Sequence, residues 1–330
     1  MRRWASLGRR ALPFFCWRGS SFVSLLPEQC ERMPRAWEEE ETDRGRNACS
    51  QGAVLCQKEG QRQLVLTTAF DEWTARAAEE AGVDMIVAWG SCQEHSKFVV
   101  EAVRRGAPNT LIGTGINPGA YESQEKALKL ANEMRAAGTD IIYCSGLVPE
   151  KFAGLARQHV PCCGHVGYLP VNNTWYGGPR GVGKTAEEAK KVYDDVMALE
   201  AAGCIAVEME CVPAKVAEEI TKRTKLLVFS MGSGPNCDGQ FIFSEDLMGT
   251  NLGRYPRHSI TYANLFTCAV DALKQFCLDV QSGAYPQARH CIKINDQEFA
   301  RFQQSLASSP TRLDRVLDSA PKSLDQYDHF

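Results

Sequence analysis

A regular alternation of short apolar runs with amphipathic segments starts at Gln63, and it limits the possible folds more than any other feature of the chain. Apolar runs bounded by glycine and polar residues predict buried strands, and the segments with a period of 3.6 between them predict helices. The predicted strands are residues 64–69, 84–89, 110–114, 140–144, 160–167, 204–211 and 225–231. The predicted helices are residues 71–81, a segment ending at 105, and residues 123–137, 149–158, 185–202 and 213–223.

Seven such alternations predict an α/β fold in which helices cover parallel strands. Because no pattern of a second sheet is present, we expect a closed (β/α)8 TIM barrel rather than an open doubly wound sheet. Residues 241–247 are assigned to the eighth strand, before a long helix at 262–280. The barrel is therefore placed at residues 61–290, and residues 291–330 are predicted to form a C-terminal helix or a mobile tail.

The first 27 residues contain five arginines and no acidic residue, with bulky apolar residues and serines between them. This composition is typical of a mitochondrial transit peptide, whose basic amphipathic helix is removed after import. The alternative is a disordered basic tail. Residues 28–60 are polar, without periodicity, and are predicted to be a linker. The predicted location is therefore the mitochondrial matrix.

Charge and composition exclude several classes of partner. A net charge of −3 provides no field for nucleic acid, and no apolar run is long enough to span a membrane. The 14 cysteines are scattered through predicted core strands, which indicates reduced thiols rather than a disulfide framework. No CxxC pair is present, so a structural zinc site is not expected.

Glu210 ends the predicted strand at 204–211, and Glu208 shares its face two residues earlier. Catalytic groups of parallel α/β folds lie at the carboxyl ends of strands. A carboxylate in an apolar strand is costly unless it is paired, protonated or bound to a cation. The sequence therefore favours Glu210 as a functional residue, the alternative being a structural salt bridge.

His165 lies near the end of the predicted strand at 160–167, where it is expected to face Glu210 across neighbouring strand ends. A neutral imidazole at this position can donate a hydrogen bond to a substrate carboxylate or carbonyl oxygen. The alternative is a core histidine whose hydrogen bonds are satisfied within the fold.

Residues 178–185 read GPRGVGKT, which matches the phosphate-binding pattern GxxxxGK[ST]. A phosphate-binding loop follows its strand directly, whereas Pro170, Asn172 and Asn173 separate this segment from the preceding strand. We therefore favour a glycine-rich lid over the barrel mouth and keep nucleotide binding as the alternative.

Six segments, in order along the chain, resemble the ketopantoate hydroxymethyltransferase family. They are AVRRGAPN at 102–109, PCCGHVG at 161–167, ALEAAG at 198–203, ECVP at 210–213, DGQ at 238–240 and SGAYP at 282–286. The resemblance implies a (β/α)8 barrel of the phosphoenolpyruvate/pyruvate type that assembles into homo-oligomeric rings. It also implies a small 2-oxo acid as substrate, 5,10-methylenetetrahydrofolate as cosubstrate and a divalent metal, Mg²⁺ or Zn²⁺.

In the implied reaction the metal chelates the 2-oxo acid, a glutamate removes the proton at C3, and the enolate attacks the methylene carbon of the folate. Glu210 stands at the position of this catalytic base. Ser91 stands at the position of a substrate-binding serine. Tyr143 and Ser145 replace a substrate-binding lysine and a glutamate beside the metal. With His165, these residues form the predicted substrate site.

The two metal-binding aspartates of the family are replaced here by Gly90 and Gly115, which removes the charge that holds the cation. Three interpretations stay open. The family reaction runs with a rebuilt site that uses Glu208 and Glu210; a lyase or aldolase reaction on another 2-oxo acid has replaced it; or a non-catalytic barrel binds a metabolite or a partner.

Overall fold

The computed structural model describes residues 14–18, 21–25, 62–116, 122–144 and 148–306. The chain divides into two compact units, Met1–Leu265 and Phe266–Phe330, which are described separately below. The predicted end of the barrel domain at residue 290 falls inside the second unit, and the predicted domain limits stay predictions.

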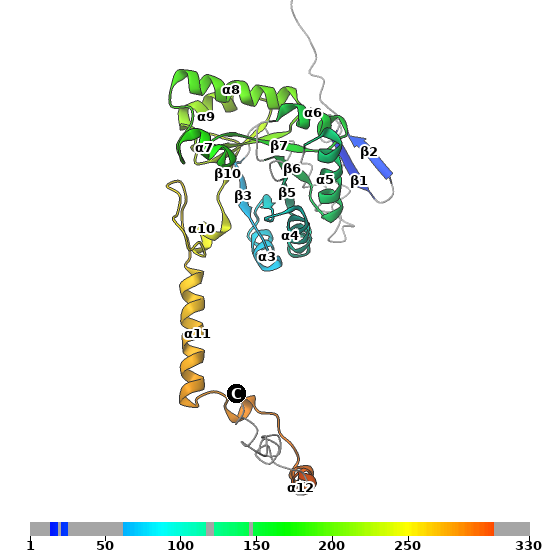
Figure 1. Cartoon of the computed structure of the whole chain (residues 1–330), viewed down its shortest axis with the longest axis vertical. Coiled ribbons are helices and arrows are strands. Elements are labelled where there is room, and N and C mark those ends of the chain that lie inside the picture. Colours follow the sequence, from blue (N-terminus) through cyan, green and yellow to red (C-terminus); the bar gives the residue numbers. More distant parts are fainter. Residues whose placement is uncertain (1–13, 19–20, 26–61, 117–121, 145–147, 307–330) are drawn as a thin grey trace, which may run out of the picture. The chain divides into compact units, whose positions relative to one another are not determined.

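Eight parallel strands close into a ring in the order β10-β3-β4-β5-β6-β7-β8-β9, which confirms the predicted (β/α)8 barrel (Figure 1). The strands are β3 Leu64–Thr68, β4 Met85–Ala88, β5 Leu111–Ile116, β6 Ile141–Cys144, β7 Cys162–Gly167, β8 Ala206–Glu210, β9 Leu227–Met231 and β10 Gly239–Phe241. Their carboxyl ends form one rim, as expected for parallel strands joined by helices.

Helices follow six of these strands and pack on the outside of the ring (Figure 1). They are α3 Glu72–Glu80, α4 Gln93–Gly106, α5 Gln124–Ala137, α6 Pro149–Arg157, α8 Ala186–Ala201 and α9 Ala214–Thr221. Three begin at a capping side chain: Asp71, Ser123 and Thr185 each accept a hydrogen bond from the backbone amide three residues on. These caps fix where the helices start.

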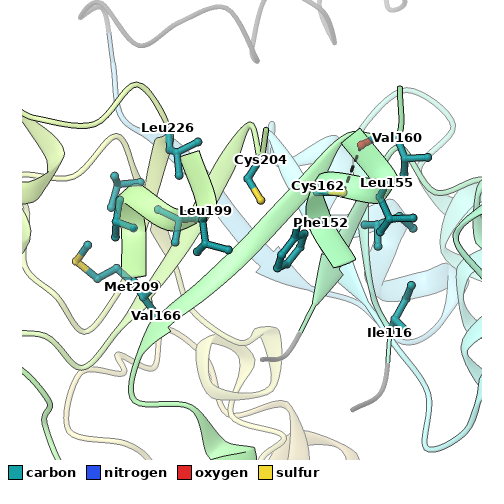
Figure 2. Packing of buried hydrophobic residues seen from close by; sticks show 14 of the residues in the cluster. Ile116, Phe152, Leu155, Val160, Cys162, Val166, Leu199, Cys204, Met209 and Leu226 are labelled. Atoms are coloured by element: carbon teal, nitrogen blue, oxygen red, sulfur yellow. Dashed lines mark hydrogen bonds between the residues drawn. The ribbon is translucent and has the colours of Figure 1, made fainter. Parts of the chain in front are cut away.

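Two apolar layers enclose the strands. The outer layer lies between strands and helices, where Phe152 and Leu199 pack against Cys162 and Met209 of the sheet (Figure 2). The inner layer fills the ring and includes Tyr143, Cys163 and Ala206. Since side chains alternate along a strand, Glu208 and Glu210 point to the inside, like Ala206.

The predicted eighth strand at residues 241–247 was wrong in position. The strand is β10, Gly239–Phe241, and Ser244–Met248 forms the short helix α10 instead. A Cβ atom at Gly239 would lie 3.0 Å from the Leu64 carbonyl oxygen, so the glycine permits close pairing there. Two acidic residues in the first turn of α10 favour a helix start, which ends the strand early.

Two further elements lie between β7 and α8, and three follow α10. They are η2 Pro170–Asn172, α7 Asn173–Tyr176, the long helix α11 Leu265–Ser282, η3 Ala288–His290 and α12 Asp296–Leu306. The helix expected at 262–280 is therefore present, and a helix follows at the predicted C-terminal segment. None of the described helices has the length and apolarity that crossing a membrane would require.

Two segments of the predicted transit peptide are described. β1 (Phe14–Arg18) pairs with β2 (Ser21–Leu25) as an antiparallel sheet, so these residues do not form the amphipathic helix expected of an import signal. The predicted linker at residues 28–60 lies outside the described residues.

Candidate active site

His165 and Glu210 meet at the carboxyl ends of the neighbouring strands β7 and β8, as the sequence predicted. His165 Nε2 lies 3.1 Å from Glu210 Oε2. The side chains are only 8% and 12% exposed. Strand register fixes this contact, because His165 pairs with Glu208 and Gly167 pairs with Glu210, one layer nearer the rim. The pair therefore lies at the carboxyl-end rim of the barrel, where this fold places its active sites.

Glu208 brings a second carboxylate to the same imidazole nitrogen. Its Oε1 atom lies 3.8 Å from His165 Nε2, and its side chain is 8% exposed. This distance suits an ion pair but is too long for a hydrogen bond. Among the described residues, none donates a hydrogen bond to the Glu208 carboxylate. One imidazole therefore faces two carboxylates in a nearly closed environment.

Burial shifts the protonation of this group. It raises the pKa of Glu208 to about 7, with the charge of Glu210 acting in the same direction and His165 opposing it. Burial by itself lowers the pKa of His165, but the charge of Glu208, with the hydrogen bond and charge of Glu210, outweighs it and raises the value. His165 and Glu208 therefore both hold a proton more tightly than they would in water.

The backbone after Glu210 is held in an unusual conformation. Cys211 has φ +55°, in the left-handed region that non-glycine residues seldom occupy. Its N–H donates to the Met231 carbonyl at 2.8 Å, and the Glu210 carbonyl accepts from Tyr168 N–H at 2.8 Å. Such strain persists where surrounding hydrogen bonds enforce it and is common at functional sites. Here the conformation of Cys211 fixes the direction of the chain directly after Glu210, at the end of β8.

Of the predicted substrate-binding residues Tyr143 and Ser145, the structure describes only Tyr143. Tyr143 is 5% exposed and packs inside the barrel beside Cys163, one layer below His165. Burial, followed by the charges of Cys163 and Glu208, raises the pKa of Tyr143 well above its usual value. Its hydroxyl lies near the Cys163 thiol. Ser145 lies outside the described residues.

The opposite side of the mouth, at the ends of β3, β4 and β10, is aromatic. Trp89 contacts Phe70 and Phe243 with ring centroids 4.8 Å and 5.6 Å away. Ser91 is exposed, and both its N–H and its Oγ lie 3.1 Å from His95 Nδ1. His95 Nδ1 therefore accepts a hydrogen bond from the Ser91 amide.

The metal positions of the family do not fit a cation in this chain. A Cβ atom at Gly90 would lie 2.5 Å from the backbone of His95 and of Ser96, so the start of α4 leaves no room for an aspartate. Gly115 likewise offers no ligand. In contrast, His165, Glu208 and Glu210 present three donor atoms that all lie within 4.8 Å of one another. Within the described parts of the chain, they are the one His/Cys/Asp/Glu group that could hold a metal.

The segment at residues 178–185 does not form a phosphate site. Thr185 caps α8, and the backbone amides of Gly183 and Lys184 both donate to the Glu188 carboxylate at 3.0 Å. A phosphate would need those amides. The Val182 amide donates to the Cys211 carbonyl at 3.1 Å, which places the segment beside the residue after Glu210. This contact agrees with a loop at the edge of the mouth.

Sequence reasoning missed two histidines near the mouth. His95 orients Ser91 from one turn further along the chain, and His258 Nδ1 lies 3.9 Å from Cys211 Sγ. The spacing of Ser91 and His95 at a helix start could have indicated the first contact. Nothing local could have indicated the second, since 47 residues separate its partners.

Comparison with known proteins matches most of the barrel. A sequence model described as ketopantoate hydroxymethyltransferase matches residues 52–288. The chain is 32% identical over 262 residues to 3-methyl-2-oxobutanoate hydroxymethyltransferase 1 of Methylibium petroleiphilum, covering 74% of this chain and 89% of that protein. It is 34% identical over 251 residues to 3-methyl-2-oxobutanoate hydroxymethyltransferase of Kosmotoga olearia, covering 70% and 93%.

Among solved structures, phosphoenolpyruvate phosphomutase of Streptomyces platensis subsp. rosaceus aligns with a TM-score of 0.46 at 13% identity, over 78% of this chain and 98% of that one. The sequence matches cover both strands that carry His165, Glu208 and Glu210 and span nearly the whole length of the relatives. The chain belongs to the ketopantoate hydroxymethyltransferase family.

Proposed function

We propose that this protein transfers a one-carbon unit from 5,10-methylenetetrahydrofolate to a 2-oxo acid, with 3-methyl-2-oxobutanoate as the substrate. The observation that carries the proposal is the strand-end carboxylate of Glu210, held 3.1 Å from His165 at the mouth of a barrel that belongs to this family. The names of the relatives agree with this reaction. They do not favour a lyase or a non-catalytic barrel.

Glu210 is the residue placed to remove the C3 proton. A general base must come within hydrogen-bond reach of the proton it takes, and it needs a fixed direction. Glu210 has one carboxylate oxygen on His165, and its backbone is fixed by the hydrogen bonds around Cys211. Its side chain remains partly accessible at 12%. These features suit a carboxylate that accepts a proton from a carbon acid.

His165 is placed to hold Glu210 and to stabilise negative charge that develops on the substrate. Its raised pKa increases the share of the imidazolium form, which donates from both ring nitrogens. A fixed donor in a water-poor site stabilises an enolate oxygen more strongly than a donor in water does. A divalent cation would replace the imidazolium proton: neutral His165 would hold it with Glu208 and Glu210, and it would add stabilisation of the enolate charge when bound.

The test is hydrogen exchange at C3 of 3-methyl-2-oxobutanoate in D₂O, followed by NMR, with and without added metal and in the absence of folate. We expect exchange by the parent protein, followed by product formation when 5,10-methylenetetrahydrofolate is added. Exchange with other 2-oxo acids but not with 3-methyl-2-oxobutanoate would indicate a different substrate. Absence of exchange with every 2-oxo acid and metal would refute the proposed reaction.

We also propose that the protein acts in the mitochondrial matrix as a homo-oligomer. The support for the location is the arginine-rich, acid-free composition of residues 1–27, and the support for the assembly is family membership. Fusing residues 1–27 to a fluorescent protein should direct it to mitochondria, and deleting them should abolish import. Light scattering on the purified chain should give a mass well above 36.5 kDa.

A further inference from the structure

The group of His165, Glu208 and Glu210 carries negative charge whenever both carboxylates are ionised, because its net charge is then −1 even with His165 protonated. A proton on Glu208 or a bound cation can neutralise it. No lysine or arginine forms an ion pair with either glutamate in the described part of the chain, where His165 is their sole ion-pair partner. Burying unpaired charge is costly. The site must also accept a 2-oxo acid, which is an anion, so additional positive charge is needed.

The geometry of the group is suited to a cation. The three donor atoms come from two adjacent, paired strands and lie within 4.8 Å of one another. The Glu208 side chain is 92% buried and accepts no hydrogen bond from the described residues, so its carboxylate oxygens can accept a cation. The buried Tyr143 side chain lies beside Cys163, in the layer below His165.

We propose that His165, Glu208 and Glu210 bind one divalent transition-metal cation. This site lies at the ends of β7 and β8, whereas Gly90 and Gly115, which stand at the expected metal positions, lie on the β4 and β5 side. An imidazole with two carboxylates suits Mn²⁺, Co²⁺ or Zn²⁺ better than Mg²⁺, which prefers oxygen ligands and retains its waters. The proposal therefore includes a change of metal preference.

The proposal rests on and deepens the proposed function. A cation bound by neutral His165 and two carboxylates gives a net charge of zero, so the site no longer repels the 2-oxo acid. A carboxylate has two oxygens, and each glutamate can bind through one of them. Glu210 then retains one oxygen for the C3 proton. Glu208 needs no role in proton transfer, which explains its deeper position.

The test is direct binding of Mn²⁺ to the full chain after removal of metal by chelation, measured by electron paramagnetic resonance and calorimetry. Mn²⁺ is the probe because the 14 cysteines would bind Zn²⁺ and Co²⁺ elsewhere. We expect one Mn²⁺ per chain, bound more tightly than Mg²⁺. Glu208→Gln and His165→Asn should each weaken binding at least about tenfold, since even groups outside the ligand shell affect metal affinity that much.

Glu245→Gln is the matched control, because Glu245 accepts a hydrogen bond from Thr68 at the same end of the barrel but lies outside the group. Its Mn²⁺ affinity should equal that of the parent. Glu208→Gln preserves shape and removes a buried charge, so thermal unfolding of the metal-free variant should show an intact fold. Absence of Mn²⁺ binding, or equal affinity in the parent and in Glu208→Gln, would overturn the proposal.

These measurements use neither the 2-oxo acid nor folate, so they test the proposed metal site independently of the proposed reaction. Binding without C3 exchange would retain the site and refute the proposed function. Exchange without binding would retain the function and refute the site.

Discussion

The two sides of the barrel mouth carry different kinds of side chain, ionisable on one side and aromatic on the other. On the β7 and β8 side, a histidine and two glutamates with little exposure face one another within 4.8 Å. On the β3, β4 and β10 side, Trp89 packs between Phe70 and Phe243, and Gly90 has no room for a side chain. Both sides have the same strand geometry, so the side chains alone determine which side can hold charge.

This difference shows that the imidazole and the two carboxylates gather at the ends of β7 and β8, although Glu245 also lies at the rim, beside Thr68 of β3. Glycines, Gly90 and Gly115, stand where the resemblance led us to expect aspartates. Glu208 adds a carboxylate beside His165 on the other side. An aromatic cluster excludes water and stabilises by packing, whereas paired acids and an imidazole attract cations and protons. We therefore expect substitutions on the charged side to change chemistry and those on the aromatic side to change stability.

The largest expected effect is on turnover by Glu210→Gln. Removing a general base typically costs on the order of 10²–10⁴ in rate, and glutamine keeps the shape of the side chain. The C3 exchange rate of 3-methyl-2-oxobutanoate should fall by that factor while the circular dichroism spectrum is retained. The control is Glu245→Gln, at the same rim. A variant that exchanges C3 as fast as the parent would show that the charged side does not supply the base.

The second effect is on the pH dependence of stability. Glu208 has a pKa of about 7 in the folded protein against 4.5 as the reference value, so the folded state binds the proton more tightly. The resulting stabilisation is complete below pH 4.5 and is lost as the pH rises through 7. Its upper bound is about 3 kcal/mol. The raised pKa of His165 acts in the same direction.

Urea unfolding of the metal-free protein at pH 5 and pH 8 measures this effect. The free energy of unfolding should be larger at pH 5, and Glu208→Gln should reduce the difference between the two values. Identical pH dependence in the parent and the variant would mean that Glu208 is not protonated in the folded state near neutral pH.

The third effect concerns Gly90 on the aromatic side. Gly90→Ala should lower the free energy of unfolding by about 2 kcal/mol, because its Cβ would lie 2.5 Å from backbone atoms of α4. Gly90→Asp should destabilise at least as much and should not create a second Mn²⁺ site. Gly253→Ala is the control, since its nearest neighbour is the end of the Asn251 side chain. A stable Gly90→Asp protein that binds a second Mn²⁺ would show that the aromatic side can also hold a charged metal site.

The smallest effect is expected at residues 178–185, beside the charged side. Mg-ATP should cause no calorimetric signal with the parent or with Lys184→Ala, because Glu188 already occupies the amides that a phosphate would use. Micromolar binding that Lys184→Ala abolishes would instead support the nucleotide site that the sequence pattern suggests.

The sequence by itself determined the barrel and most of its elements. Hydrophobic periodicity located seven strands within a few residues. A barrel strand is buried on both faces, by the helices outside and by the interior side chains, so it is a continuous apolar run. It also identified Glu208, Glu210 and His165, since a charge within such a run is unusual. The eighth strand was misplaced because Gly239–Phe241 is too short to show a pattern, and its pairing depends on neighbours that are distant in sequence.

Only the tertiary structure decided how these side chains combine. The register of β7 against β8 brings Glu208 and Glu210 to one nitrogen of His165, and sequence spacing does not fix register between strands. Burial at that point, which depends on the closed ring, raises the pKa of Glu208. The same closure places Tyr143 in the interior and sets Trp89 against Phe243. The local sequence pattern determines the strand and the face on which each residue lies. Contacts across the ring determine its charge state and its partners.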